Sequence, residues 1–514
     1  MTSAAYDLIG QRQQRLAKVE QLKKMGIDPY PAKSFRNQVI KEVKDKFAEF
    51  EGKNVTLAGR LMSFREHGKL KFSDLVDQSG KIQILLREDW LMPTNKEKQS
   101  LGFNDLNLLD IGDIVEINGE INKSKTGEVS IFAKVVRILT KSLRPLPNTF
   151  EDKEQQFRRR YLDLIINPQK KDLFLRKAKF GQSCREFMLA KDFIEVETPV
   201  LEHLTGGADA RPFITHHNDL DQDFYLRIST ELYQKRLVGG GFEKVFTIGP
   251  NFRNEGLSDE HLQEFYQLEW YWAYANYQDN MGLVKELFKY IADKVYGKTQ
   301  FKTRGHEFDL GADWQIIDYP KVIQERFGVD IFQDSDEKIL QVIRKQNLEL
   351  AGTINRNRML DNLWKLIRKD ISGPAFLINE PKFMSPLAKS KPEDPRLTER
   401  FHVIIAGSEL GNGYSELNDP QDQLARFLEQ QKLRASGDEE AQMMDIDFVE
   451  MLEYGMPPTS GYGQSERVFW YLEDVTAREG TLFPQLKFEL ENNTKKIYQD
   501  IEEYIDPVTK KTRI

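Results

Sequence analysis

Apolar residues near the start of the chain recur at helical spacing. Leu16, Val19 and Leu22 follow one another at intervals of three within residues 6–24, and basic residues lie between them. Gly26 and the prolines of GIDPYPAK then end the pattern. We therefore expect a basic amphipathic helix, and its charged face is either solvated or in contact with RNA.

Short alternating patterns replace the helical one from about residue 55 to residue 143. The segments VTLAGRLMSF, KLKFSDLVD, GKIQILLR and GDIVEINGEI are typical of short strands separated by Gly, Asp and Lys turns. Such a succession predicts a small antiparallel barrel, for which the oligonucleotide-binding five-stranded barrel is one candidate. Phe72 would be available there to stack on bases. Pro145 and Pro147 predict a linker after the barrel.

A larger domain of mixed helices and strands is predicted from about residue 151 to residue 483. FIEVETPVL follows the first helices as a strand that ends at Pro199, and a helical stretch lies near residues 337–369. The tail after Pro484 is charged, and its pattern gives it no role.

Two strands in this domain, VFTIGPNFRNE and QEFYQLEWYWA, are joined by the polar segment GLSDEHL and predict a hairpin. Side chains alternate between the two faces of a strand. One face is apolar and consists of Phe246, Ile248, Phe252, Tyr266, Leu268, Trp270 and Trp272. The other face collects Arg253, Glu255, Phe265, Glu269 and Tyr271. A solvated polar face explains these charges, whereas a ligand site also explains two aromatic rings beside a guanidinium that suits phosphate.

Composition narrows the class of protein. The chain has 514 residues, 39% of them hydrophobic and 30% charged, which predicts a multidomain globular protein. We expect no membrane span, because no apolar run approaches the roughly 18 residues that cross a bilayer. The segment MTSAAYDLIGQRQQR lacks the pattern of a secretory signal, so a cytoplasmic location is expected. The net charge of −7 argues against a generally nucleic-acid-binding surface but leaves room for a local basic face.

The chain contains one cysteine, Cys184, in the segment GQSCREFMLA. A single cysteine excludes disulfides and zinc–thiolate sites within the chain. We interpret Cys184 as a buried structural thiol on a helix.

Three separated segments carry a resemblance to a known family. FIEVETPVL is similar to the first motif of class II aminoacyl-tRNA synthetases, FRNEG through QEFYQLEWY to the second, and PPTSGYGQSERVFWYLED to the third. The long intervening segments GGADARPFITHHNDLDQDFYLRISTELYQKRLVGGGFEKVF, SPLAKSKPEDPRLTERF and GSELGNGYSELNDPQDQ follow the lysyl pattern, as does GIDPYP. Over nearly its whole length the chain resembles the lysyl-tRNA synthetases, within the lysyl, aspartyl and asparaginyl subgroup.

The resemblance implies an α+β fold in which an antiparallel catalytic sheet is flanked by helices, with an N-terminal five-stranded OB-fold barrel. The expected domains are a helical extension over 1–50, an anticodon-binding barrel over 51–146, a catalytic domain with a helical insertion over 147–490, and a tail over 491–514. The implied activity joins L-lysine to lysine tRNA at the expense of ATP. Magnesium and a homodimer are also implied.

The resemblance assigns roles to individual residues. Arg253 and Arg467 are the expected catalytic residues. The expected ATP site contains Arg253, Glu255, His261, Phe265, Glu409 and Arg467, with Phe265 and Arg467 on opposite faces of adenine. The expected lysine site contains Gly207, Glu231, Glu269, Tyr271, Asn412, Tyr414 and Glu416. Glu409 and Glu416 are the expected metal ligands, and Arg65, Phe72, Gln83 and Glu128 fall near anticodon-reading positions.

An acidic lysine pocket also follows from the chemistry of the amino acid. Lysine carries two ammonium groups and one carboxylate, so a selective pocket needs several carboxylates and an aromatic wall along the aliphatic stem. Glu231, Glu269, Tyr271, Tyr414 and Glu416 supply these groups.

The chain departs from the family pattern at three places near the phosphate end of the site: His402, the loop that carries Glu260 and Gln263, and the third motif. His402 stands at a usual magnesium-ligand position, where imidazole suits that ion poorly; an ordinary strand histidine is the alternative. Glu260 stands where a basic residue commonly faces the outer phosphates, so it either opposes ATP or turns to solvent. Gln263 replaces a proline, which predicts a less rigid loop. The third motif, GYGQSER, is one residue short before Arg467.

Other functions remain open at this stage. An aspartyl- or asparaginyl-tRNA synthetase has the same architecture, but its pocket needs cations or amide-binding groups instead of carboxylates. A synthetase-derived protein is the second alternative: a lysine-transferring enzyme, a regulator or a non-catalytic RNA-binding protein. The predicted barrel favours tRNA as the partner.

Overall fold

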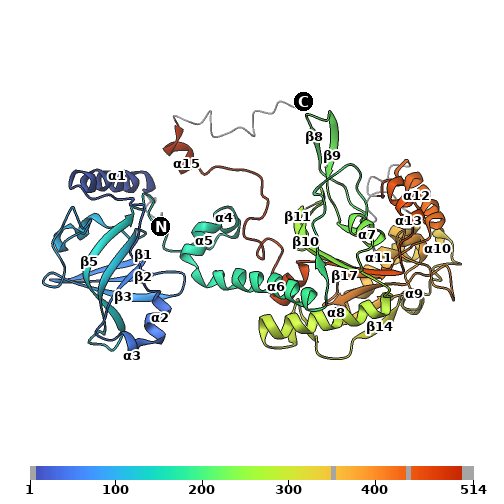
Figure 1. Cartoon of the computed structure of the whole chain (residues 1–514), viewed down its shortest axis with the longest axis horizontal. Coiled ribbons are helices and arrows are strands. Elements are labelled where there is room, and N and C mark those ends of the chain that lie inside the picture. The colour runs from blue at the N-terminus through green and yellow to red at the C-terminus, as the bar shows by residue number, and fades with distance from the viewer. Residues whose placement is uncertain (1–6, 257, 349–354, 436–440, 500–514) are drawn as a thin grey trace. The chain divides into compact units, whose positions relative to one another are not determined.

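The computed structural model describes residues 7–256, 258–348, 355–435 and 441–499. Their contacts divide them into two compact units: residues 7–150 together with 487–499, and residues 151–486 (Figure 1). Each unit has its own apolar core.

The first unit is built on a barrel that five strands close within the described part of the chain. The strand order is β1-β2-β3-β5-β4, antiparallel except for the β3–β5 pair. The strands are β1 Asn54–His67, β2 Leu70–Val76, β3 Lys81–Arg87, β4 Ile114–Lys123 and β5 Val129–Thr140. Inward-facing positions on alternate residues fill the barrel with aliphatic side chains. The expected five-stranded OB-type barrel is confirmed.

The N-terminal segment packs within this unit. Leu22, Ile27 and Ile40 are buried in the same core as the barrel strands. The Arg15 guanidinium, buried in helix α1, donates to the carbonyls of Ile111 and Ser142 at 3.0 and 2.9 Å. The basic face of α1 is therefore used in part for packing on the barrel. The helical elements of the unit are α1 Leu8–Lys24, α2 Ile40–Asp45, α3 Phe47–Phe50, η1 Phe103–Leu108 and α15 Asn492–Ile497.

The start of the C-terminal tail also belongs to this unit. Arg144 donates to the Thr494 hydroxyl at 3.3 Å, and the Arg12 guanidinium lies 5.9 Å from the centre of the Tyr498 ring. Residues 500–514, which the sequence left without a role, lie outside the described residues.

The second unit is built on a sheet of eight strands within its described residues. The order is β14-β15-β16-β17-β18-β11-β10-β6, antiparallel in the centre and parallel at the β14–β15 and β6–β10 edges. The strands are β6 Ile194–Glu195, β10 Lys244–Phe252, β11 Glu264–Ala273, β14 Gln315–Asp318, β15 Ala375–Ile378, β16 Arg400–Ile405, β17 Ser408–Ser415 and β18 Thr459–Ser465. Smaller sheets are formed by β7 Leu201–Glu202, β8 Ile214–His217 and β9 Gln222–Leu226, and by the hairpin β12 Gln300–Thr303 and β13 His306–Asp309. The α+β class with a largely antiparallel catalytic sheet is confirmed.

Helices cover both faces of the large sheet. Helices α6 and α8 pack with Phe246, Leu268 and Trp270 on one face (Figure 1). Helices α7, α12 and α13 pack near Tyr271 on the other. The helical insertion, α9 to α11, has a core of its own against β14 and β15. The helical elements are α4 Lys153–Arg158, α5 Arg160–Ile166, η2 Pro168–Lys170, α6 Lys171–Ala190, α7 Glu231–Gly239, α8 Tyr277–Ile291, η3 Ala292–Tyr296, α9 Tyr319–Phe327, α10 Asp336–Lys345, α11 Arg356–Arg368, η4 Lys382–Met384, α12 Pro420–Ala435, α13 Ile446–Tyr454 and α14 Arg467–Leu472.

Cys184 is a buried member of the α6 core. Burial raises the pKa of its thiol to about 12, so the group stays protonated at neutral pH. No helix in the described ranges is long and apolar enough to cross a bilayer.

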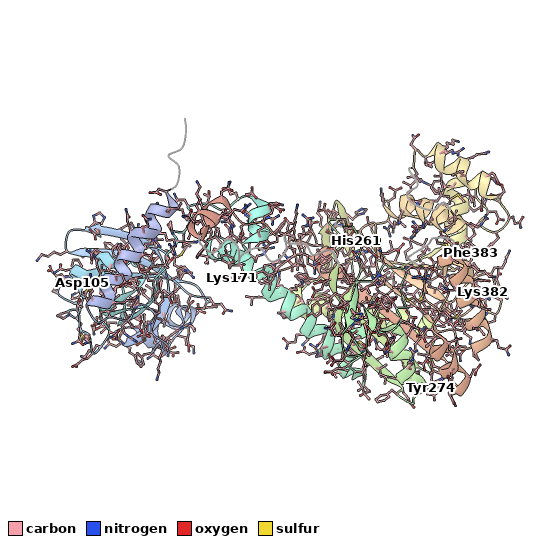
Figure 2. The ribbon with its side chains drawn as sticks, turned by 90° about the horizontal axis from the view of Figure 1, so that it is seen from above. Asp105, Lys171, His261, Tyr274, Lys382 and Phe383 are labelled. Atoms are coloured by element: carbon pink, nitrogen blue, oxygen red, sulfur yellow. The ribbon has the colours of Figure 1, made fainter. Side chains whose placement is uncertain are left out.

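The predicted hairpin is formed by β10 and β11. One of its residues and the neighbouring strand of the first motif differ from the expected pattern. Tyr266 was placed on the apolar face, but it is 53% exposed because it lies near the end of β11. The expected FIEVETPVL strand forms a ladder only at Ile194–Glu195, since the chain pairs with β10 at two positions before it leaves the sheet. At its other end β11 stops at Ala273, and Tyr274 takes a positive φ of 63° at the rim of the unit (Figure 2).

Candidate active site

One cavity of about 350 Å³ opens on the face of the large sheet that carries Glu269 and Tyr271. Strands β11, β17 and β18 form its floor, and the start of α7 and the segment 253–265 form its sides. It brings together all the residues that the sequence assigned to ATP, lysine or metal: Gly207, Glu231, Arg253, Glu255, His261, Phe265, Glu269, Tyr271, His402, Glu409, Asn412, Tyr414, Glu416 and Arg467.

Strand periodicity explains why these side chains converge. Glu269 and Tyr271 are two residues apart on β11, so they share the face opposite the buried Trp270. Asn412 and Tyr414 share a face of β17 in the same way. Glu269 is 3% and Tyr271 2% exposed, so this part of the charged face is enclosed, whereas Glu255 at the loop end of the hairpin is exposed.

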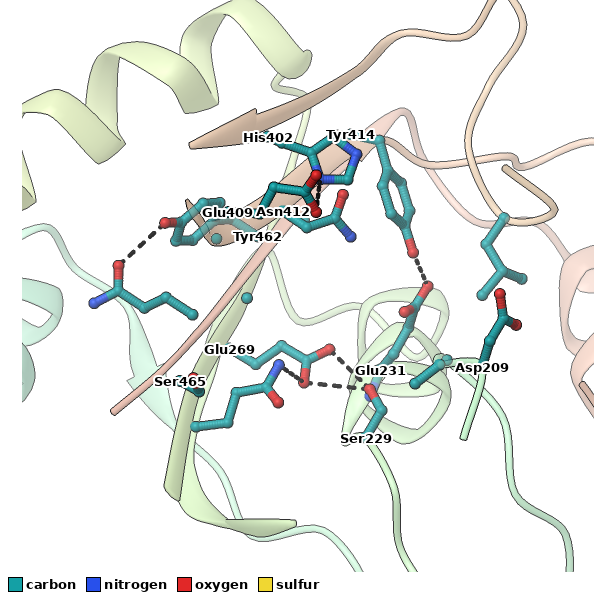
Figure 3. A pocket seen from close by; sticks show the side chains of 18 of the residues that line it. Asp209, Ser229, Glu231, Glu269, His402, Glu409, Asn412, Tyr414, Tyr462 and Ser465 are labelled. Atoms are coloured by element: carbon teal, nitrogen blue, oxygen red, sulfur yellow. Dashed lines mark hydrogen bonds and ion pairs between the residues drawn. The ribbon is translucent and has the colours of Figure 1, made fainter. Parts of the chain in front are cut away.

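Three buried glutamates lie at one end of the cavity around a buried lysine. Lys235, one turn after Glu231 on α7, places its Nζ 2.6 Å from Glu231 Oε1 and also forms an ion pair with Glu416. The Tyr414 hydroxyl donates to Glu231, as Figure 3 shows. Sequence reasoning did not single out Lys235, although the Glu231–Lys235 spacing of four on a helix was a usable signal.

Hydrogen bonds and ion pairs compensate the buried negative charges of the three glutamates to different degrees. Glu269 accepts hydrogen bonds from the hydroxyls of Tyr271 at 2.7 Å and Thr230 at 2.8 Å. Within the described residues, neither oxygen of Glu416 accepts a well-formed hydrogen bond, so its ion pair with Lys235 is the compensation. Burial raises the pKa of Glu416 well above its usual value despite Lys235, and nearby Glu231 adds to the rise. Burial and the charge of Glu231 also raise the pKa of Glu269.

The middle of the cavity holds a guanidinium over an aromatic ring. The guanidinium carbon of Arg253 lies 5.2 Å from the centre of the Phe265 ring. Arg467, which we expected opposite Phe265 across adenine, lines the same cavity and donates a hydrogen bond to Glu260. His261 contacts Ser258 Oγ through Nδ1 at 2.8 Å, and burial together with the charge of Arg467 lowers the pKa of the imidazole.

Glu260 does not turn to solvent. Its Oε2 accepts a hydrogen bond of 2.6 Å from Arg467 Nη2, and its Oε1 accepts one of 2.6 Å from the Tyr471 hydroxyl and pairs with Arg304. The alternative that placed Glu260 in solvent is therefore wrong, because two guanidinium groups compensate its charge. Arg467 still lines the cavity from the start of α14 despite the shortened third motif. Gln263, at the usual proline position, donates to the Glu255 carbonyl at 3.0 Å and so links the two sides of the loop.

Both expected metal ligands, Glu409 and Glu416, line the cavity. Glu409 accepts a 2.5 Å hydrogen bond from Trp364, pairs with Arg368 at 3.1 Å and lies 3.6 Å from His402 Nδ1.

The side chains near Glu409 form a poor set of ligands for magnesium. The described residues contain no group of three or more His, Cys, Asp or Glu side chains arranged to hold a metal. His402 Nε2 lies 3.3 Å from Glu380, which is paired with Arg400 at 2.6 Å. Burial would raise the pKa of Glu409, but His402 and Arg368 lower it to about 2. A hard cation that needs about six oxygen ligands is not matched by this set.

Comparison with known proteins gives the family. Residues 152–487 match the model of class II tRNA synthetases for D, K and N, and residues 55–139 match the OB-fold nucleic acid binding domain. A lysine--tRNA ligase from Thermosipho africanus is 46% identical, and the match covers 93% of this chain and 96% of the relative. Those from Thermotoga maritima and Roseiflexus sp. are 44% and 42% identical over 93% of this chain, and over 96% and 98% of their own lengths. The chain belongs to the lysyl-tRNA synthetase family.

The barrel of this lysyl-tRNA synthetase family member presents the expected anticodon residues on one face. Arg65 on β1 is opposite Phe72 on β2. Gln83 on β3 is opposite Asp74, two residues from Phe72, and on its other side opposite Ser130, two residues from Glu128. Because paired residues and residues two apart share a face of a sheet, Arg65, Phe72, Gln83 and Glu128 point the same way.

Sequence reasoning missed several cations of the synthetase site. Arg400 on β16 lines the cavity and donates from Nε to the side-chain oxygen Oδ1 of Asn412 at 2.8 Å. Arg304 follows β12 and Arg368 ends α11, and both reach the carboxylates of the phosphate end. Neither lies in a family motif, and each is more than 40 residues from its partner, so no local spacing could have indicated them.

Proposed function

We propose that the chain is a lysine--tRNA ligase that activates L-lysine with ATP to lysyl-adenylate and pyrophosphate, and then transfers lysine to the 3′ end of lysine tRNA. The observation that most directly supports this proposal is the negative charge of the side chains at the acidic end of the cavity. In their ionised forms, Glu231, Glu269 and Glu416 with Lys235 leave two uncompensated negative charges, and free lysine brings two ammonium groups whose charges favour those forms. Arg253 lines the same cavity, where the lysine carboxylate and the α-phosphate would meet.

The assigned roles agree with this balance. Gly207 and Glu231 would receive the α-ammonium group, Glu269, Tyr271 and Glu416 the ε-ammonium group, and Asn412 the carboxylate. Gly207 has a φ of +82°, and an added Cβ would come within 2.7 Å of the Glu231 side chain, so the position needs glycine. An aspartate side chain would add a negative charge to an already negative pocket. The site therefore favours lysine over the aspartyl and asparaginyl alternatives.

The first step needs positioning and charge compensation from the protein. A carboxylate oxygen of lysine attacks the α-phosphorus of ATP, the bond from that phosphorus to the bridging oxygen breaks, and pyrophosphate leaves with the electron pair. Arg253 would stabilise the negative charge on the α-phosphate oxygens, and Phe265 would stack on adenine. No side-chain nucleophile is required, since both reacting groups are held in one cavity.

The resemblance implies magnesium as the cofactor, and divalent metal use is general among such ligases. The residues near Glu409 and His402 do not fit a magnesium ion held by the protein alone. We therefore propose that Arg467 compensates the negative charge of the phosphates at the end of the cavity near Glu409.

Two partners complete the proposal. Lysine tRNA would be read by the barrel face of Arg65, Phe72, Gln83 and Glu128. A second copy of the chain would cover exposed apolar side chains in and beside the first motif: Ile194, Val200, Leu201 and Leu204. Light scattering coupled to gel filtration should give twice the chain mass of 59.9 kDa. We propose the cytoplasm as the site of action.

Amino-acid-dependent exchange of pyrophosphate into ATP, measured with each amino acid in turn, tests the activation step. We expect exchange with lysine and none above background with aspartate or asparagine. Exchange driven by either of those two would overturn the lysine assignment. Charging of lysine tRNA by an exchange-competent preparation tests the second step, and exchange without charging would support the synthetase-derived alternative.

A further inference from the structure

A second cavity, of about 190 Å³, adjoins the active site at Ser229, which lines both cavities. Its walls come from residues 202–206, from α7 and from the start of α13. The side chains that give it charge and apolar surface are Glu202, Arg236, Asp445, Asp447, Leu204 and Leu232. Roughly six water molecules would fill this volume, so the cavity has room for an organic ligand of about that many non-hydrogen atoms.

Glu202 places a carboxyl group without a partner on the wall of this cavity. It ends strand β7, where alternation leaves Leu201 45% exposed and Glu202 only 3% exposed. Among the residues that the structure describes, no group donates a hydrogen bond to this carboxyl group and no cation forms an ion pair with it. Burial of a carboxyl group without such partners is unfavourable, and a bound cation would supply them.

The guanidinium groups near Glu202 are committed to other partners. Arg236 pairs with Asp445 and Asp447 at 2.9 and 2.7 Å. Arg227 donates to backbone carbonyls of two other segments at 2.8 and 3.0 Å. Burial therefore outweighs the charges of both arginines and raises the pKa of Glu202 to about 8. When Glu202 is ionised, the five side chains together carry one net negative charge, which a monovalent cation would balance.

We propose that this cavity is a second ligand site, which binds a small primary alkylammonium ion through the Glu202 carboxylate, with Leu204 and Leu232 against the alkyl chain. An ammonium group has three hydrogen-bond donors and a compact charge, which suit a carboxylate that lacks both. The volume of the cavity selects an amine smaller than free lysine. Binding of the amine does not depend on the proposed ligase activity, whereas an effect on lysine use rests on it.

Ser229 connects the new site to the proposed lysine pocket. Its hydroxyl lies 3.3 Å from each oxygen of Glu269 and donates to that carboxylate (Figure 3). It also accepts a hydrogen bond of 3.2 Å from the backbone N–H of Glu231. A cation bound at ionised Glu202 therefore adds positive charge beside two groups that would hold the ammonium groups of lysine. We expect each ligand to weaken the binding of the other by the same factor, about fivefold.

The test is a ligand-observed NMR titration of the full-length protein, in its native oligomeric state, with n-butylamine. At about pH 9 Glu202 is ionised and an alkylamine is still protonated. n-Butanol has the same number of non-hydrogen atoms and no charge, and it should not bind. Glu202→Gln keeps the size of the side chain and should weaken amine binding about tenfold or more. Glu429→Gln, which removes an exposed carboxylate on α12, is the matched control and should match the parent.

n-Butylammonium also resembles the side chain of lysine, so the two cavities have to be separated. Glu416→Gln changes the lysine pocket and does not touch the second cavity. Amine binding that survives Glu416→Gln and is lost in Glu202→Gln supports the second site. Loss in Glu416→Gln with no change in Glu202→Gln would assign the amine to the lysine pocket and overturn the proposal, as would equal binding of n-butanol or no binding of n-butylamine to the parent.

Asp447→Lys keeps the test decisive if Glu202→Gln folds poorly. The Asp447 side chain is 80% exposed and lines the cavity, so the new lysine adds a cation to the wall without disturbing the core. We expect amine binding to weaken about tenfold or more, because like charges repel or the new ammonium itself takes the carboxylate. Glu453→Lys makes the same change of charge on α13 at an exposed residue that does not line the cavity, and should have no effect. Unchanged amine affinity in both Glu202→Gln and Asp447→Lys would also overturn the site.

Titration calorimetry with lysine, with and without saturating n-butylamine, tests the connection through Ser229. A loss of lysine affinity that disappears in Glu202→Gln supports the coupling. A loss that persists in that variant is direct competition in the lysine pocket, and either this result or an unchanged affinity would refute the coupling. Absence of lysine-dependent pyrophosphate exchange would instead refute the proposed function and leave the NMR result for the amine standing.

Discussion

Removing one charge from the lysine pocket is the most direct test of how it selects its substrate. Glu416 is 1% exposed and follows β17, and Lys235 is its ion-pair partner. In Glu416→Gln the Lys235 ammonium keeps Glu231 at 2.6 Å, so no buried cation is left without a partner and the fold should be retained. The variant pocket then offers one uncompensated negative charge to a substrate that brings two positive ones.

The magnitude follows from the burial of the site. Truncating one member of a buried, hydrogen-bonded charge pair costs about 2–5 kcal/mol, and every 1.4 kcal/mol is a factor of ten. We therefore expect kcat/KM for lysine to fall by about 30- to 5,000-fold. The KM for ATP should change by less than about threefold, because Glu416 is at the far end of the cavity from Arg467 and Glu260.

Lysine-dependent exchange of pyrophosphate into ATP measures both constants when lysine and ATP are varied separately. Glu393→Gln, which removes a 70% exposed carboxylate, is the matched control and should match the parent. Circular dichroism and thermal melting check that the Glu416 variant is folded. A folded variant with unchanged kcat/KM for lysine would refute the prediction that the charge of Glu416 holds lysine. If only the kinetic constants for ATP changed, Glu416 would act on ATP binding and not on lysine binding.

Three further predictions concern the barrel, a buried carboxyl and the metal-ligand position. Phe72→Ala should lower tRNA charging by about 5- to 150-fold, the cost of one stacked base, and leave lysine-dependent exchange unchanged; an equal loss in both assays would argue against a tRNA contact. Glu202 is 3% exposed, and burial, only partly offset by Arg227, raises its pKa to about 8 from 4.5. The folded state therefore keeps a proton that the unfolded state loses between these pH values, so stability falls as pH rises through that window. The Tm of Glu202→Gln relative to the parent should accordingly climb from pH 5 to pH 8, by the equivalent of up to roughly 4 kcal/mol, and a flat difference would contradict the shift. His402→Glu places a third carboxylate beside Glu380 and Glu409, so half-saturation of exchange should occur at lower magnesium; superimposable magnesium titrations would remove this interpretation.

Local pattern was enough for the elements and for much of the site. Alternation along β11 separated Trp270 from Glu269 and Tyr271, and the structure has these residues on opposite faces of the sheet. The short alternating strands of residues 54–140 indicated the barrel because Gly, Asp and Lys turns separate them. The second and third motifs indicated residues that one cavity brings together, since these motifs lie on strands and a helix start that line it.

The errors fall where contacts join distant segments. The alternative that sent Glu260 to solvent ignored Arg467, which is 207 residues away in the chain, and Arg304 on a hairpin that carries no motif. The packing of Leu22, from the N-terminal helix, in the barrel core is a further contact that local pattern could not indicate.

The sequence by itself determined the family, the strand and helix pattern, and the sign of charge that the lysine pocket needs, because these depend on periodicity and on residue types at fixed spacings. Only the tertiary structure decided which charges compensate one another: Lys235 within the acidic end, and Arg304 and Arg467 around Glu260. The physical reason is that the pairing energy of a buried charge depends on distance and burial in three dimensions, and neither quantity is expressed in the local order of residues.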